Sequence, residues 1–160
     1  MHKQHSLANM LAGLAMSAIS LGVMAHGDVT PHPVDTTGLE SLGTEWRDAN
    51  PYRGNEHAIE KGAEGYKHNC AGCHGLNVET GGVAPDLLKI DADCLDMAAD
   101  QKQSCLKDAD EYFKDVVLSG KKNSEGRFTM PAYNGVFTQE AVWAIKAYVD
   151  ARTVEDAATR

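Results

Sequence analysis

The stretch Cys70-Ala71-Gly72-Cys73-His74 decides how this chain folds. The pattern C-x-x-C-H is the signature of a c-type haem attachment site. Two thiols separated by two residues can each form a thioether to one vinyl group of a haem, and the histidine that follows is placed to coordinate the iron. We therefore predict that one haem c is attached covalently to Cys70 and Cys73, with His74 as the proximal iron ligand.

Two other chemistries use a pair of cysteines at this spacing. A thioredoxin-like redox pair follows a strand and opens a helix, whereas a helical pattern precedes Cys70 here. A zinc site needs a second pair of ligands, and no nearby His or Cys supplies one at the usual spacing. Both stay alternatives to haem attachment.

A second axial ligand decides whether the iron is closed to small molecules. Met130 lies 56 residues after the motif histidine and precedes Pro131, whose ring fixes one backbone torsion and stiffens the loop. A thioether on the far side completes the coordination and raises the reduction potential relative to a second imidazole. We predict Met130 as this ligand. The alternatives are Met97, between the two remaining cysteines, and His57 and His68, which precede the motif.

Two cysteines lie outside the attachment motif. Cys94 and Cys105 enclose ten residues, and in an oxidising compartment such a pair forms a disulfide that closes a local loop. A zinc site would again need two further ligands, and free thiols are the other alternative.

Residues 1–25 have the features of an export signal. Lys3 and the amino terminus supply positive charge, an apolar run covers about residues 11–24, and Ala25 ends a small-residue cleavage site. The alternative is an uncleaved membrane anchor, but the run is shorter than about 20 residues and contains two serines. We expect cleavage, a mature chain starting near His26 without a membrane span, and a periplasmic location.

The composition limits the partners and the core. The formal charge of −8 becomes −9 when the predicted signal and its one lysine are removed. An acidic surface repels phosphate backbones, which excludes nucleic acid as a partner, whereas it attracts a protein with a basic patch. Only 6% of the residues are aromatic, so side chains alone would form a thin core that a buried haem would help to fill.

Apolar periodicity and capping residues predict three helices. They are expected over residues 55–68, 110–118 and 139–151, with Asn55 and Thr138 as the caps of the first and the last. No segment alternates with period two for long enough to require a sheet. The predicted fold class is therefore all-α, with three or more helices and long loops wrapped around one haem.

The chain divides into four expected segments. They are a signal peptide at 1–25, an extended arm at 26–54, a haem domain at 55–152 and a tail at 153–160. The arm is rich in Pro and Gly and has no sustained apolar period. We expect its aromatic residues, Trp46 and Tyr52, to hold it against the haem domain.

The residues from about 55 to 150 resemble class I cytochromes c. The resemblance rests on Gly62 and Tyr66 in the first helix, the C-x-x-C-H motif, a Gly-x-x-Pro-x-Leu stretch at 82–87 and a final helix bearing Tyr148. It implies that the first and last helices cross with Gly62 against Tyr148. It also supports our expectation that the backbone carbonyl of Pro85 accepts a hydrogen bond from the motif histidine.

A closer resemblance extends into the arm. The stretches at residues 26–31 and 51–55 are similar to the cytochrome c-550 family that accompanies quinoprotein alcohol dehydrogenases. This resemblance implies that a PQQ-dependent alcohol dehydrogenase donates electrons and that a downstream cytochrome or terminal oxidase accepts them. The chain departs from that family between Ile90 and Asp110, where the cysteine-bracketed segment is an insertion.

Three functions compete on this sequence. The leading one is a monohaem carrier of single electrons, which is not an enzyme and has no catalytic residue. A haem peroxidase or gas-binding sensor needs an open iron site, which a methionine ligand argues against. A fixed subunit of a larger oxidoreductase, docked through the arm, is the third.

Overall fold

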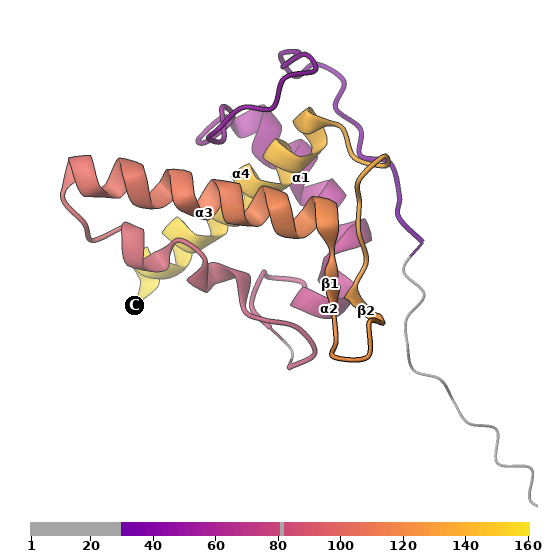
Figure 1. The fold of residues 1–160 in the computed structure, drawn as a ribbon. Helices are drawn as coiled ribbons and strands as arrows, with labels where there is room; N and C mark the ends of the chain where they lie inside the picture. The colour runs from indigo at the N-terminus through magenta and orange to yellow at the C-terminus, as the bar shows by residue number, and fades with distance from the viewer. Residues whose placement is uncertain (1–29, 81) are drawn as a thin grey trace, which may run out of the picture.

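The computed structural model describes residues 30–80 and 82–160, so the predicted signal peptide at 1–25 and the first residues of the arm lie outside the described residues. Figure 1 shows a small set of helices joined by long loops. In chain order the elements are α1 (Glu56–Asn69), α2 (Ala71–His74), η1 (Leu87–Lys89), η2 (Ala92–Cys94), α3 (Ala99–Ser119), β1 (Lys121–Lys122), β2 (Phe128–Met130) and α4 (Gln139–Thr159). The predicted all-α class is confirmed.

Helix α1 begins where the sequence predicted. Asn55 has extended backbone angles, and its side-chain oxygen accepts a hydrogen bond from Ala58 N at 3.0 Å. This contact satisfies one of the amides that a helix leaves unpaired in its first turn. The helix ends at Asn69, one residue beyond the prediction, and runs directly into the attachment motif.

Helix α4 starts as predicted and ends later. Thr138 caps it by accepting from Ala141 N at 3.3 Å, but the helix continues to Thr159 and not to residue 151. The expected tail at 153–160 is therefore mostly helical. The side chain of Thr153 is buried, and it donates a hydrogen bond to the carbonyl of Val149 at 3.1 Å, which ties this extra turn to the preceding one.

Helix α3 is more than twice as long as the predicted segment at 110–118. Its second half buries Phe113 and Val117, which gave the periodic signal. Its first half, residues 99–108, buries no side chain, so no apolar pattern marks it. The disulfide between Cys94 and Cys105 ties this half to η2 and confirms the predicted pairing.

A short hairpin interrupts the loop between α3 and α4. Strands β1 and β2 pair antiparallel, with Lys121 opposite Met130 and Lys122 opposite Phe128. Gly120 ends α3 and leads into β1. Its φ is +68°, and a Cβ there would lie 2.5 Å from the carbonyl oxygen of Met130, so glycine suits this position. Strands of two and three residues are too short to show a period in the sequence, so the hairpin was not predicted.

The α1–α4 pair forms the most extensive contact between elements. The helices cross at Gly62, where a Cβ would come within 1.9 Å of the carbonyl oxygen of Ala144. The expectation that Gly62 packs against Tyr148 is therefore wrong. Tyr148 lies one helical turn further on and packs against Tyr66, with ring centroids 5.3 Å apart.

The described part of the arm, residues 30–54, is fixed along α4 although it contains no helix or strand. Leu42 N donates a hydrogen bond to Glu140 Oε1 at 2.8 Å. The ring of Trp46 packs edge-on against the buried ring of Trp143, with the ring centroids 6.2 Å apart. Tyr52 is buried and donates its hydroxyl proton to the carbonyl of Glu40. The expectation is confirmed for Tyr52, whose ring belongs to the buried core cluster, and only in part for Trp46, which contacts Trp143 but stays 37% exposed.

Candidate functional site

The attachment motif lies on one tight helical turn. Cys70 ends α1 and donates its backbone N–H to Tyr66 O at 2.8 Å, and the next four residues form α2. His74 N donates to Cys70 O at 2.9 Å, which closes the turn. Because residues three apart on a helical turn share a face, this turn places the thiols of Cys70 and Cys73 on the same side.

His74 is oriented by the segment that follows it. Its side chain is buried, and its Nδ1 lies 2.9 Å from the carbonyl oxygen of Pro85. A carbonyl can only accept, so Nδ1 carries the proton and Nε2 keeps its lone pair for a metal. The expectation for Pro85 is confirmed. The hydroxyl of Tyr66 also donates to Gly75 O at 2.7 Å, which fixes the backbone just after the histidine.

The two motif cysteines are unpaired, whereas the other two are joined in a disulfide. Burial raises the pKa of Cys70 to about 12, and the charge of neighbouring Cys73 adds to this effect. A thioredoxin-like redox pair needs a thiolate, which a lowered pKa supplies. The site shows the reverse, which argues against a thiol-exchange role for Cys70.

The loop bearing Met130 is brought next to the attachment turn. The hydroxyl of Tyr133 donates to the backbone carbonyl of Asn69 at 2.8 Å, and Asn69 is the residue before Cys70. Tyr133 N also donates to Val117 O at 3.0 Å, so α3 holds the other side of the loop. Met130 itself is partly buried against the core. The structure thus joins two segments that lie far apart in the sequence.

These residues fit a c-type haem. Two unpaired thiols share one face, a buried imidazole has one nitrogen held and the other available, and a thioether lies in a loop tied to the same turn. A haem bound here would supply an iron that alternates between the ferric and ferrous states. The protein would supply the attachment, the orientation of the imidazole and the burial.

The alternative ligands lie elsewhere. His57 and His68 are on α1 with exposed side chains, paired with Glu60 and Glu64 at 3.8 Å. Within residues 30–80 and 82–160, no group of three His, Cys, Asp or Glu is arranged to hold a metal ion.

Two hydroxyl groups that anchor the site, those of Tyr133 and Tyr66, were not identified from the sequence. Neither position carries a motif that marks its hydroxyl.

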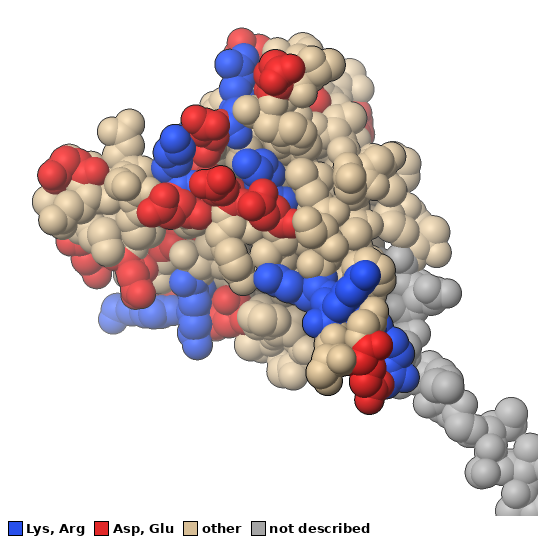
Figure 2. All heavy atoms as spheres, in the orientation of Figure 1, with Lys and Arg blue, Asp and Glu red and all other residues tan. Residues whose placement is uncertain are grey.

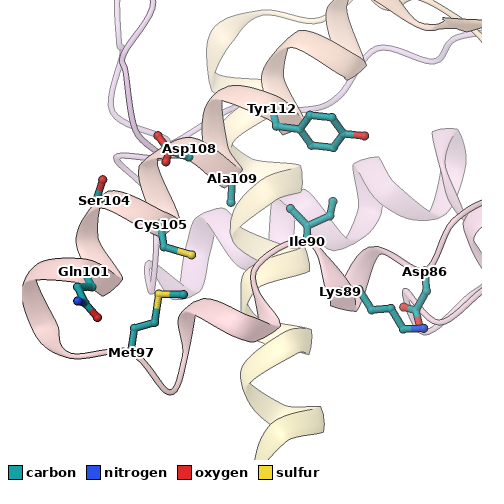
Figure 3. A pocket seen from close by; sticks show the side chains of 10 residues that line it. All are labelled: Asp86, Lys89, Ile90, Met97, Gln101, Ser104, Cys105, Asp108, Ala109 and Tyr112. Atoms are coloured by element: carbon teal, nitrogen blue, oxygen red, sulfur yellow. The ribbon is translucent and has the colours of Figure 1, made fainter.

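Met97, the remaining alternative, borders a separate groove. Figure 3 shows this groove between α3 and the segment that contains η1 and η2. Its volume is about 820 Å³, and its apolar wall includes Ile90, Met97, Ala109 and Tyr112. No residue of the attachment motif lines it. The groove is therefore distinct from the candidate haem site.

Known proteins resemble this chain over most of its length. Residues 57–149 match the family described as Cytochrome C oxidase, cbb3-type, subunit III. The chain is 41% identical to a protein named cytochrome c550 from Pseudomonas aeruginosa, over 98% of this chain and 100% of that protein. No solved structure matches it. The similarity thus extends beyond the motif, into the arm and the last helix.

Proposed function

Because the chain belongs to the c-type cytochrome family, we propose that it carries single electrons on one haem c bound covalently through Cys70 and Cys73. His74 and Met130 are the axial ligands of the iron in this proposal. The family and the relative named cytochrome c550 support haem binding and electron transport. The count of one haem follows from the single C-x-x-C-H motif in the sequence.

The hydrogen bond from His74 Nδ1 to the Pro85 carbonyl is the observation that carries this proposal. It fixes both the tautomer and the direction of the imidazole, which a permanent iron ligand requires. With Met130 as the second ligand, the coordination is the same before and after electron transfer, so little has to rearrange. A peroxidase or a gas sensor needs a position that opens, and this arrangement offers none without displacing the Met130 loop.

Substitution of the proposed ligand tests the assignment. The oxidised protein is expected to show the weak long-wavelength absorption band of thioether-ligated ferric iron, and Met130→Ala is expected to abolish it. Met97→Ala is the matched control, because Met97 is a partly exposed methionine that borders the separate groove. A band that survives Met130→Ala would show that another residue ligates the iron. Mass spectrometry of the denatured protein is expected to find one haem retained.

We propose the periplasm as the location, and a PQQ-dependent alcohol dehydrogenase as the electron donor. The signal features of residues 1–25 and the resemblance at 26–31 and 51–55 support this proposal. None of the helices within residues 30–80 and 82–160 has the length and apolar character to span a bilayer. The test is reduction of the purified protein by such a dehydrogenase in the presence of its alcohol, with passage of the electron to a downstream cytochrome or terminal oxidase.

Charge near the Met130 loop offers a route for docking a donor. Figure 2 shows basic side chains gathered in the region of the β1–β2 hairpin, although the protein is acidic overall. The hairpin segment carries Lys121, Lys122 and Arg127 and ends at Met130, although Arg127 is paired with Glu125 in the same hairpin. A partner with an acidic contact surface would be steered there, so the rate of electron uptake is expected to fall as ionic strength rises.

A fixed subunit of a larger oxidoreductase is the second candidate, because the matching family is described as an oxidase subunit. The described part of the arm argues against arm-mediated docking, since Gln139 binds it at Gly43 O and Glu45 O, at 3.2 and 3.0 Å. Deleting residues 26–54 is therefore expected to reduce stability first. Loss of partner affinity with unchanged stability would instead favour the fixed subunit.

A further inference from the structure

Five charged side chains meet in the interior, on the side of α4 that faces α3 and η2. They are Arg53, Asp91, Asp110, Lys146 and Asp150. Lys146 is completely buried, the three aspartates are nearly so, and only Arg53 is partly open to solvent. Two cations face three carboxylates, so the fully ionised cluster has one negative charge in excess.

Lys146 is the centre of the cluster. Its Nζ lies 3.0 Å from Asp91 Oδ2 and 3.5 Å from Asp110 Oδ1, and it also donates to Asp150 Oδ1. Burial opposes the charged form of Lys146, but Asp150 and Asp91 outweigh it and raise its pKa. Lys146 therefore stays protonated. Any change in the number of protons that the cluster binds must involve its carboxyl groups.

The second cation comes from the arm. Arg53 Nη2 lies 2.5 Å from Asp110 Oδ1, and Nη1 lies 3.1 Å from Asp150 Oδ2 and 3.8 Å from Asp91 Oδ2. Asn50 completes the shell, because its backbone N–H donates to Asp110 Oδ2 at 2.8 Å and its amide donates to Asp150 Oδ2 at 3.3 Å.

Asp91 and Asp150 are the two carboxylates that bear on this excess charge. Asp91 Oδ1 is buried and accepts no hydrogen bond, which is costly for an ionised oxygen in the interior. Burial raises the pKa of Asp150 to about 7, and the negative charge of Asp91 adds to this effect against the opposing charge of Lys146. One proton bound by this pair of carboxyls would neutralise the excess charge of the cluster.

This cluster is linked to the candidate haem site by a short segment. Asp91 lies six residues after Pro85, whose carbonyl holds His74. Between them η1 packs against α4, and Leu88 is buried at that contact. The segment is thus fixed at one end by the proximal ligand and at the other by Lys146. An electron added at the haem site is a negative charge, and charges interact more strongly within a protein than in water.

We propose that Asp91 and Asp150 form a proton-binding site, and that its affinity for the proton increases when the protein gains an electron. The inference rests on the electron-carrier function proposed above. The electron comes from the redox donor, the proton comes from solvent, and when both are taken up the net charge of the protein is unchanged. On oxidation the electron leaves to the acceptor and the proton returns to water.

The midpoint potential of the haem-loaded protein as a function of pH tests this proposal. The potential is expected to fall as the pH rises through neutrality, with a slope up to the limit of about 59 mV per tenfold change in proton concentration for one proton and one electron. Asp150→Asn, which mimics the protonated carboxyl, is expected to remove this slope. Asp108→Asn, at an exposed position on α3, is the control and is expected to retain it.

A potential independent of pH, or a slope unchanged in Asp150→Asn, would overturn the proposal. If that variant does not fold, carbon-13 NMR of the aspartate carboxyl groups in the native protein decides. One aspartate is expected to titrate near neutral pH, with its midpoint at higher pH in the reduced form than in the oxidised form. Titration of every aspartate below about pH 5 in both forms would refute the site, since that is the range of ordinary carboxyls. Failure to observe any reversible one-electron couple would instead contradict the electron-carrier function.

Discussion

Replacement of Gly62 by alanine tests the crossing of α1 and α4. The added Cβ would lie 1.9 Å from Ala144 O, 2.5 Å from Ala144 C and 3.0 Å from Ile145 N, whereas ordinary contacts begin at 3.4 Å. The helices would have to separate by about 1.5 Å, the difference between 3.4 and 1.9 Å. All three obstructing atoms belong to the backbone, so no change of rotamer relieves the overlap.

The expected loss follows from two opposing effects. Overpacking a core typically destabilises by about 1–3 kcal/mol, and a backbone clash belongs at the upper end of that range. Alanine gains about 1 kcal/mol over glycine in a helix interior. We therefore expect Gly62→Ala to lower the free energy of unfolding by about 2 kcal/mol, equivalent to a fall in Tm of roughly 5–10 °C.

Gly65→Ala provides the matched control on the same helix. It gains the same helix propensity, but its Cβ would meet only side-chain atoms of Val34 and Ile145, at 2.9–3.2 Å, which can shift. Guanidinium denaturation of both haem-loaded variants, followed by circular dichroism and haem absorbance, gives the comparison. If Gly62→Ala is as stable as Gly65→Ala, the close backbone crossing described here is wrong.

Three further changes have defined outcomes. Replacing both Cys94 and Cys105 by serine opens a link with a sequence separation of 11 and is expected to cost about 2–3 kcal/mol of unfolding free energy, measured in urea. Tyr133→Phe removes the donor to the carbonyl before the motif, so we expect a loss of about 1 kcal/mol and disappearance of the Met130 band at lower temperature. The raised pKa of Asp150, about 7 against an ordinary 3.8, means that the native state holds a proton which the unfolded chain releases. Its contribution to the free energy of unfolding is therefore expected to fall as the pH rises from about 4 to about 7, and Asp150→Asn to flatten that fall; an unchanged pH profile would refute it.

The parts of the fold that could be predicted are those marked by local chemistry. The caps Asn55 and Thr138 gave both helix starts, because side-chain oxygens that accept from first-turn amides are a local signal. The attachment motif and the spare cysteine pair were equally local. The first half of α3 gave no signal, since its residues bury nothing and are tied to η2 by the disulfide.

The interior charge cluster could not be predicted because its members are brought together only by the fold. Lys146 stands in an apolar stretch of α4, where a lysine normally projects to solvent. It is buried here because carboxylates arrive from α3 and from the start of η2. The same limit applies to the helix crossing, where Gly62 meets Ala144 and Tyr66 meets Tyr148, so that the predicted partner of the glycine was one turn away.

The attachment of the arm to α4 has a consequence for the order in which the protein folds. Leu42 bonds to Glu140, 98 residues away, and Asn50 bonds to Asp150, 100 residues away. Closing loops of this length is slow, because the chain loses conformational entropy before any stabilising contact forms. During synthesis the arm and α1 emerge long before α4, so the contacts that hold both of them to α4 form last. A chain interrupted before residue 138 is therefore expected to be an unfolded, protease-sensitive fragment and not a smaller carrier.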